Sequence, residues 1–219
     1  CADREATAVL VAINSVFQVA MFGVMGWFYL QVLPGWLGLD TTSVEFSFWS
    51  IVTAVLVFLG IPLLLGVLSR VWGEKVKGRE WFEDRFLPAV SPLAMIGLLY
   101  TIVLLFSLQG EQLVAQPTAV VRVAIPLVIY FVGMFFLALG VAKVGGMNYA
   151  QSASVAFTAA GNNFELAIAV SIGTFGAASA QALAGTIGPL IEIPVLVGLV
   201  YIMLWIGPKL FPGDKSLPN

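Results

Sequence analysis

Charged residues divide the chain into long apolar stretches. They are absent from positions 6–39, 46–69, 86–110, 123–142, 166–191 and 193–208. A helix needs about 20 apolar residues to cross the ~30 Å hydrocarbon layer of a bilayer. Because the stretches are continuously apolar rather than alternating, helices are favoured over a membrane barrel. The pattern predicts an all-α polytopic membrane protein with six transmembrane helices, at residues 7–32, 46–69, 87–108, 120–142, 149–174 and 183–207.

Composition supports one membrane domain over residues 1–219. Hydrophobic residues make up 60% of the chain and charged residues 10%, against ~45–50% and ~25% in soluble domains. The net charge of −2 gives no basic field for a nucleic-acid partner. A single Cys and no His exclude a disulfide, a multi-thiolate metal site and the commonest general base. We therefore expect the lipid bilayer as a partner, no metal, no cofactor and no enzymatic activity.

Basic residues are distributed unevenly between the two ends of the predicted spans. Nine of the ten Lys and Arg residues fall at the N-terminal end, between the second and third spans, between the fourth and fifth, or at the C-terminus. Only Arg122 falls near the other ends of the spans. The positive-inside rule therefore predicts a multi-pass protein of the plasma or inner membrane with both termini of this chain in the cytoplasm.

The fifth span contains an unusual polar cluster. Gly161, Asn162 and Asn163 interrupt its apolar pattern, and Glu165 follows directly. A charge near mid-membrane costs ~2.5–3.5 kcal/mol on insertion scales, so such a group is protonated, paired or in a wet cavity. A broken membrane helix frees backbone groups that bind an ion or polar solute together with amides and a carboxylate. The cluster predicts a broken helix and a binding site; the alternative is a hydrogen-bonded contact between helices without transport chemistry.

Three further polar residues lie inside predicted spans. Glu192 lies between Pro189 and Pro194, so it either stabilises the first turn of a helix opened by Pro189 or takes a direct part in the site. Asn14 and Gln18 lie one turn apart on the same face of the first span. They either form interhelical hydrogen bonds or line the site.

The first and last spans resemble each other at an offset of 178 positions. The matched pairs are Ile13 and Ile191, Val19 and Val197, Met25 and Met203, Trp27 and Trp205, and Pro34-Gly35 and Pro212-Gly213. Inverted repeats are typical of secondary transporters. This predicts residues 1–40 as the end of a first repeat and 41–219 as a second. Because the chain starts at Cys1 rather than Met, we expect it to begin partway through a larger protein.

Several motifs resemble the arsenical-resistance arsenite efflux permeases of the bile acid/sodium symporter superfamily. The matching segments are 157–170 (FTAAGNNFELAIAV), 188–196 (GPLIEIPVL), 3–5, 14–18 and 33–38. The resemblance covers essentially the whole chain and implies a ten-helix fold of two inverted five-helix repeats, of which this chain is the last part. It implies that Glu165 is the functional carboxylate of the broken helix. It also implies that the family's arsenite-binding cysteine lies in a helix preceding this chain, and Cys1 does not match it.

The resulting interpretation is a secondary transporter that extrudes arsenite in exchange for protons, with Glu165 as the coupling carboxylate. The expected site residues are Glu165, Asn162, Asn163, Glu192, Asn14 and Gln18. The nearest alternative is a sodium-coupled organic-anion symporter of the same superfamily, but Asn-Asn-Phe-Glu at 162–165 differs from that branch's Glu-x-Gly-x-Gln-Asn pattern. An intramembrane protease and a non-transporting membrane scaffold or sensor are two rival interpretations. Antimonite transport, sodium as the coupling ion and the oligomeric state stay open.

Overall fold

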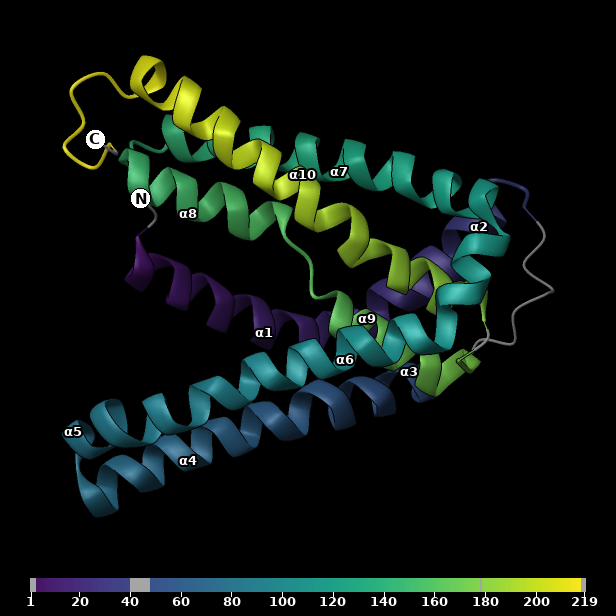
Figure 1. The fold of residues 1–219 in the computed structure, drawn as a ribbon, viewed down its shortest axis with the longest axis horizontal. Helices are drawn as coiled ribbons and strands as arrows, with labels where there is room; N and C mark the ends of the chain where they lie inside the picture. The colour runs from purple at the N-terminus through teal and green to yellow at the C-terminus, as the bar shows by residue number, and fades with distance from the viewer. Residues whose placement is uncertain (1–2, 40–47, 178, 218–219) are drawn as a thin grey trace.

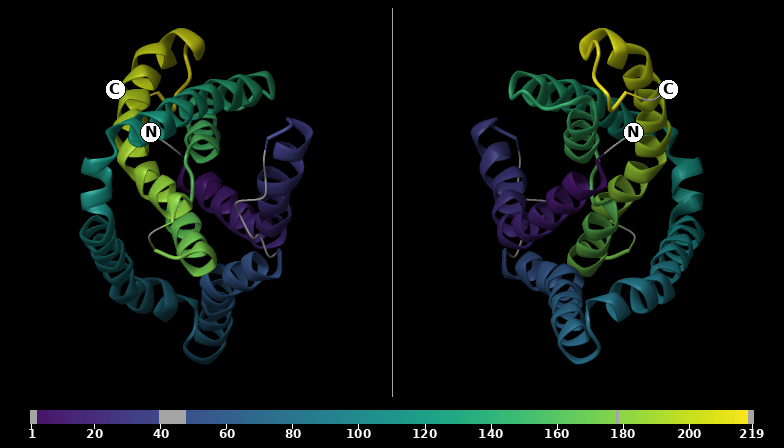
Figure 2. Two further views of the ribbon diagram at one scale, coloured as in Figure 1. Left: turned by 90° about the vertical axis from the view of Figure 1, so that its right-hand side faces the viewer. Right: turned by 90° about the vertical axis from the view of Figure 1, so that its left-hand side faces the viewer.

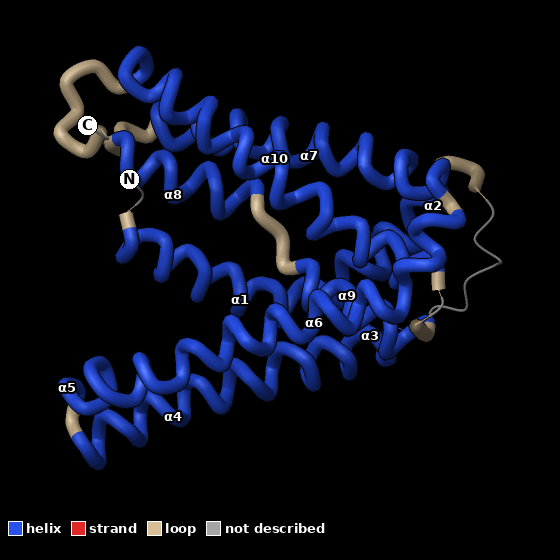
Figure 3. Tube along the Cα trace, in the orientation of Figure 1, coloured by secondary structure: helices blue, strands red, loops and turns tan. Residues whose placement is uncertain are grey.

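The computed structural model describes residues 3–39, 48–177 and 179–217, and these residues form helices and loops without a strand (Figure 3). The helices are α1 (Arg4–Trp27), α2 (Leu33–Trp36), α3 (Phe48–Val55), α4 (Ile61–Lys77), α5 (Arg79–Trp81), α6 (Leu87–Ala115), α7 (Pro117–Val144), α8 (Tyr149–Ala160), α9 (Phe164–Phe175) and α10 (Ala180–Leu210). Short π-helical segments at Phe28–Val32, Leu56–Gly60 and Phe82–Phe86 join α1 to α2, α3 to α4 and α5 to α6. Cys1 and residues 46–47 of the predicted second span lie outside the described residues.

Six stretches of the described chain are long and apolar enough to cross a membrane. They are Glu5–Trp36, Phe48–Lys77, Arg79–Leu108, Pro117–Val144, Tyr149–Phe175 and Ala180–Leu210. Each overlaps one predicted span, which confirms the all-α polytopic fold. Residues 73–85, between the second and third predicted spans, are mostly helical. The chain turns there at Gly78, whose φ of 87° lies in the left-handed region that glycine adopts without steric cost.

The helices form a packed group and a projecting hairpin. In the group, α8 packs against α7 and α1, α10 packs against α7 and α9, and α3 packs against α1 and α9. The hairpin consists of α4 and α6 with α5 at its tip, and it runs along the lower edge of the molecule in Figure 1. The end views in Figure 2 place α4 and the tip of this hairpin at the side of the molecule away from the C-terminus, while α6 diverges from α4 and runs along the side of the molecule toward α7. Its long apolar side chains are largely exposed, as expected of helices that face lipid.

The segments that carry most of the basic residues share one end of the molecule. The N-terminus, the junction of α7 and α8, the C-terminus and α5 all lie at the left of Figure 1. α1 begins at this end and α10 finishes there, so the first and last spans run in opposite directions. This arrangement agrees with the predicted charge asymmetry, while the cytoplasmic location of this end stays a prediction.

The C-terminal segment caps the first turn of α8. Asp214 Oδ2 accepts the Tyr149 N–H at 2.7 Å, and Ser216 Oγ accepts the Ala150 N–H at 3.2 Å. These bonds satisfy N–H groups that have no partner inside the helix. Hydrogen bonds from the hydroxyl and the backbone N–H of Ser216, together with the bond from Tyr149, hold the pKa of Asp214 below its ordinary value. The charged carboxylate is therefore the form that this contact favours.

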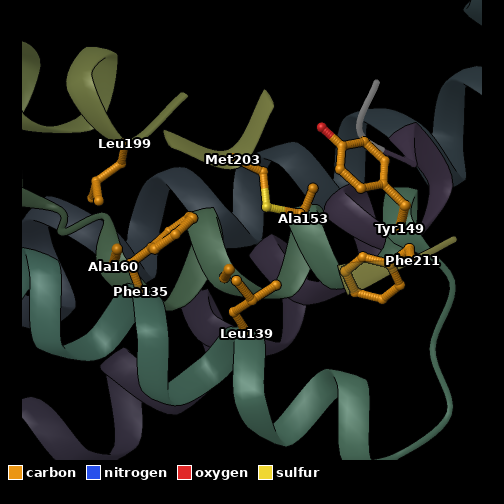
Figure 4. Packing of buried hydrophobic residues seen from close by; sticks show 9 residues of the cluster. Phe135, Leu139, Tyr149, Ala153, Ala160, Leu199, Met203 and Phe211 are labelled. Atoms are coloured by element: carbon orange, nitrogen blue, oxygen red, sulfur yellow. The ribbon is translucent and has the colours of Figure 1, made fainter. Parts of the chain in front are cut away.

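The largest buried cluster joins α7, α8 and α10 (Figure 4). The cluster contains Phe135 and Leu139 of α7 and Ala153 and Ala160 of α8, together with Tyr149, Ala156, Leu199, Met203 and Phe211. Small residues let the helices approach closely, as is common in membranes. At Gly207, a Cβ would lie 2.4 Å from the Tyr149 ring, which is 1% exposed. This cluster fixes α8 against α7 and α10.

The helix that follows α8 shares α7 and α10 as partners and adds α3. Leu166 and Val170 of α9 form a cluster with Ile51, Ala54 and Val55 of α3. Phe164 and Ile168 pack on Phe131 of α7 on another side of α9. Both halves of the fifth span therefore pack on α7 and α10, but α8 also packs on α1 and α9 also packs on α3.

Candidate functional site

The fifth span is interrupted at residues 161–163, as the sequence predicts. α8 ends at Ala160, and the Gly161 N–H still donates to Phe157 O at 2.9 Å. Gly161 then takes an extended conformation with φ −67° and ψ 151°. α9 begins at Phe164, and Asn163 Oδ1 caps it by accepting the Leu166 N–H at 3.0 Å. Asn is among the preferred N-cap residues because its side chain can satisfy such an N–H.

Glu165 lies in the first turn of α9. The positive end of the helix dipole favours a carboxylate there. Its side chain is exposed in the described structure. Glu165 and Glu192 are close enough to interact electrostatically, and Glu192 interacts in the same way with Tyr130. The break therefore brings two carboxylates and a phenol from three different helices into one neighbourhood.

Glu192 reaches the break from the side of α10. Its Oε1 accepts the Asn162 N–H at 2.9 Å. The prediction that Pro189 opens a helix with Glu192 in its first turn is wrong, because α10 runs from Ala180 through both Pro189 and Pro194. The carboxylate does satisfy an N–H freed by a helix end, but that N–H belongs to the fifth span.

The two amides of the break contact different helices. Asn163 Nδ2 donates to Gln18 Oε1 of α1 at 3.3 Å. The Tyr130 hydroxyl of α7 donates to Asn162 Oδ1 at 3.4 Å. Gln18 thus contacts the break, in the interhelical bond that was one of its two predicted roles.

Asn14 has a different environment. It lines a shallow pocket between α1 and α8, together with Phe17, Val155 and Thr158 among others. Its side chain is exposed. The structure therefore places Asn14 beside α8, before the break, rather than in the network that joins Gln18, Asn163, Asn162 and Glu192.

Sequence reasoning missed Tyr130. Nothing in the local pattern of span 120–142 distinguishes Tyr130 from its apolar neighbours. Its hydroxyl meets Asn162 across 32 positions of sequence. Only the packing of α7 beside the fifth span reveals this contact.

Chemically, the break offers amide groups and carboxylates to a small polar solute. Asn162 and Glu165 are exposed, and amides both donate and accept hydrogen bonds. Among the described residues, no group of three or more His, Cys, Asp or Glu side chains could hold a metal ion. The arrangement suits a small hydrogen-bonding solute.

The comparisons with known proteins point to one family. Residues 1–116 match the model of the Sodium Bile acid symporter family. The chain is 81% identical over its full length to the arsenical-resistance protein Acr3 of Corynebacterium glutamicum, of which it covers 59%. It is 37% identical to an uncharacterized transporter of Synechocystis sp. and 34% identical to Acr3 of Alkaliphilus metalliredigens. Each of these alignments covers 91% of the chain, and they cover 50% and 54% of those relatives.

The chain therefore spans between half and three-fifths of the length of these relatives. No solved structure matches the chain.

Proposed function

The chain belongs to the sodium bile acid symporter family, and from this premise we propose that the protein is a secondary transporter that extrudes arsenite. The observation that carries the proposal is Glu165 in the first turn of a half-helix, beside a break inside a membrane span. Broken helices of this kind form the substrate and ion sites of many secondary transporters. The two arsenical-resistance relatives support arsenite as the transported solute and support a transport role over an enzymatic one.

The proposed binding groups are Asn162, Asn163 and Glu165. Arsenite near neutral pH is largely the uncharged As(OH)₃, a small solute whose hydroxyls donate and accept hydrogen bonds. Exposed amides at the break match that chemistry. Gln18 and Glu192 are proposed to hold the break in place, and a part for Asn14 in lining the path stays a prediction.

Efflux against a gradient needs a coupling ion, and we propose the proton. Glu165 is the only carboxylate within the fifth span. A carboxylate that alternates between protonated and ionised forms near mid-membrane can link proton entry to solute exit. The proposed location is the plasma or inner membrane, with the end that carries both termini in the cytoplasm.

Sodium-coupled transport of an organic anion is the second candidate, and the family match over residues 1–116 supports it. However, Asn-Asn-Phe-Glu at 162–165 differs from the Glu-x-Gly-x-Gln-Asn pattern of the sodium-coupled branch. Testing vesicles with a sodium gradient and with a pH gradient separates the two candidates.

The test is arsenite uptake by everted membrane vesicles, driven by a pH gradient, using the protein at the length the cell produces. Glu165→Gln keeps the size and hydrogen bonding of the side chain but fixes it as neutral, so proton-coupled transport should fall to background. Glu165→Asp keeps titration with a shorter reach and should retain part of the rate. Normal pH-driven transport by Glu165→Gln at normal expression would remove Glu165 from the mechanism.

Glu80→Gln is the matched control for this series. Glu80 lies at the turn between α4 and α6, and its side chain is exposed. The described ion pairs join Arg70 to Glu74 and Arg79 to Glu83, and neither involves Glu80. This variant should transport at the unsubstituted rate. A loss equal to that of Glu165→Gln would show that removing any carboxylate impairs the protein.

A further inference from the structure

Asn162 is held from two sides, its backbone by Glu192 at 2.9 Å and its side chain by Tyr130 at 3.4 Å. We propose that Glu192 and Tyr130 are positioning residues that fix the conformation of the helix break, with Glu192 acting as a hydrogen-bond acceptor rather than as a proton carrier. The consequence for transport rests on the proposed function, whereas the effect on the backbone does not.

The need for an acceptor follows from the break itself. In a continuous helix the Asn162 N–H would donate to the carbonyl oxygen of Thr158, four residues earlier. At the break this partner is lost, and inside a membrane an N–H without a partner is costly. Glu192 Oε1 takes the place of that carbonyl. A side chain of α10 thereby stabilises an irregular backbone in α8–α9 that the fifth span cannot stabilise alone.

Gly161 lies directly beside this contact. Its φ of −67° is open to any residue, so backbone freedom does not explain the glycine. A Cβ at this position would lie 3.4 Å from Glu192 Oε1 and 3.3 Å from Phe157 O. The distance to Phe157 O is tighter than nine in ten real Cβ contacts. The missing side chain therefore relieves a close contact with the last turn of α8, while the carboxylate lies at an ordinary contact distance beside it.

Tyr130 makes the weaker of the two contacts. A donor–acceptor distance of 3.4 Å lies beyond the usual range for a hydroxyl donor. The ring is oriented by an edge-to-face contact with Phe131, whose own ring makes an edge-to-face contact with Phe164 at the start of α9. Tyr130 therefore contacts the break at Asn162, and its neighbour Phe131 contacts the start of α9 at Phe164.

Two substitutions at Glu192 separate an acceptor from a proton carrier. Gln keeps an oxygen that can accept the Asn162 N–H but cannot titrate, whereas Met has similar length and no comparable acceptor. Amide hydrogen exchange of the peptide covering residues 158–168, followed by mass spectrometry, reports on this N–H without arsenite. Efflux measured over a range of pH reports on coupling.

The proposal predicts that the Asn162 N–H exchanges roughly 10-fold faster or more in the Glu192→Met protein than in the unsubstituted protein. This is the usual effect of losing a hydrogen bond to a charged group. In the Glu192→Gln protein the exchange rate of this N–H should stay within about threefold of that in the unsubstituted protein. This variant should also keep most of the efflux rate, with an unshifted pH profile. If the Met variant is not recovered in the membrane, Glu192→Asp replaces it, because the shorter side chain loses the contact while keeping its charge.

The proposal is overturned by either of two results. One is acceleration of exchange by Gln equal to that by Met, or by Asp where Asp replaces Met, which would mean that a neutral acceptor at position 192 does not hold the Asn162 N–H. The other is unchanged exchange with a lost or shifted pH profile in Glu192→Gln, which would make Glu192 a proton carrier. If the unsubstituted protein moves no arsenite, the proposed function fails, and the exchange data still decide the positioning role.

Tyr130→Phe tests the second contact, with Tyr201→Phe as its matched control. Tyr201 is also a tyrosine within a spanning helix, and it is 70% exposed. Loss of the Tyr130 hydroxyl should accelerate exchange at Asn162 about two- to fivefold, less than the Glu192→Met effect, because the bond is long. The control should change nothing. Identical exchange in both tyrosine variants would remove Tyr130 from the proposal.

Discussion

Substitution of Gly188 by alanine offers a direct test of how closely α10 and α9 pack beside the break. An added Cβ would lie 2.2 Å from two atoms of the Phe164 ring. Contacts under 3.0 Å essentially do not occur, so the ring would have to move by about 0.8 Å, the difference between 3.0 and 2.2 Å. Phe164 is 9% exposed and packs on Phe131, which is fully buried. The ring therefore has little free space to enter.

The expected cost follows from two opposing effects. Overpacking a well-packed core costs typically ~1–3 kcal/mol, while replacing glycine by alanine within a helix gains about 0.5–1 kcal/mol. We expect a net destabilisation of about 1–2 kcal/mol. For a protein of this size this corresponds to a decrease in Tm of about 2–8 °C. Because Phe164 is the first residue of α9, arsenite efflux should decrease as well.

Gly198→Ala is the matched control, since it lies in the same helix and its Cβ would have no neighbour within 4 Å. The Gly198→Ala protein should have the same Tm as the unsubstituted protein or a slightly higher one. Thermal unfolding of the purified protein in one detergent measures both variants. A Gly188→Ala protein as stable as the Gly198→Ala protein would refute the close packing of α10 on Phe164.

Two further predictions concern the end that carries the termini. Because the basic residues lie there, a cysteine replacing Lys77 should be protected from an impermeant thiol reagent in intact cells, while one replacing Gln116 between α6 and α7 should react; the reverse pattern would invert the orientation. The folded-state pKa of Asp214 is depressed, so its contribution to stability is present above the unfolded value of ~3.9 and is lost as the pH falls through the lower folded value. The difference in Tm between the unsubstituted protein and Asp214→Asn should therefore shrink between pH 5 and about pH 2; a difference that grows on acidification would contradict this linkage.

Local sequence was sufficient for the spans and for the position of the break. Long charge-free runs have one stable solution in lipid, because helices satisfy their backbone hydrogen bonds internally. The break at Gly161–Asn163 was also predictable, since Asn163 is an N-cap residue and Glu165 suits a first turn. These features depend on neighbours within about four residues, which is the range over which a helix forms or ends.

The contacts that complete the site were decided by tertiary structure. Prolines suggested a helix start at Pro189, yet α10 continues through it, because a membrane helix tolerates proline where neighbouring groups compensate for the lost bond. Glu192 and Tyr130 reach Asn162 across 30 and 32 positions of sequence. No local pattern encodes which N–H a distant carboxylate will accept. That pairing arises only when α7 and α10 pack against the fifth span and bring their side chains to a backbone group that its own helix has released.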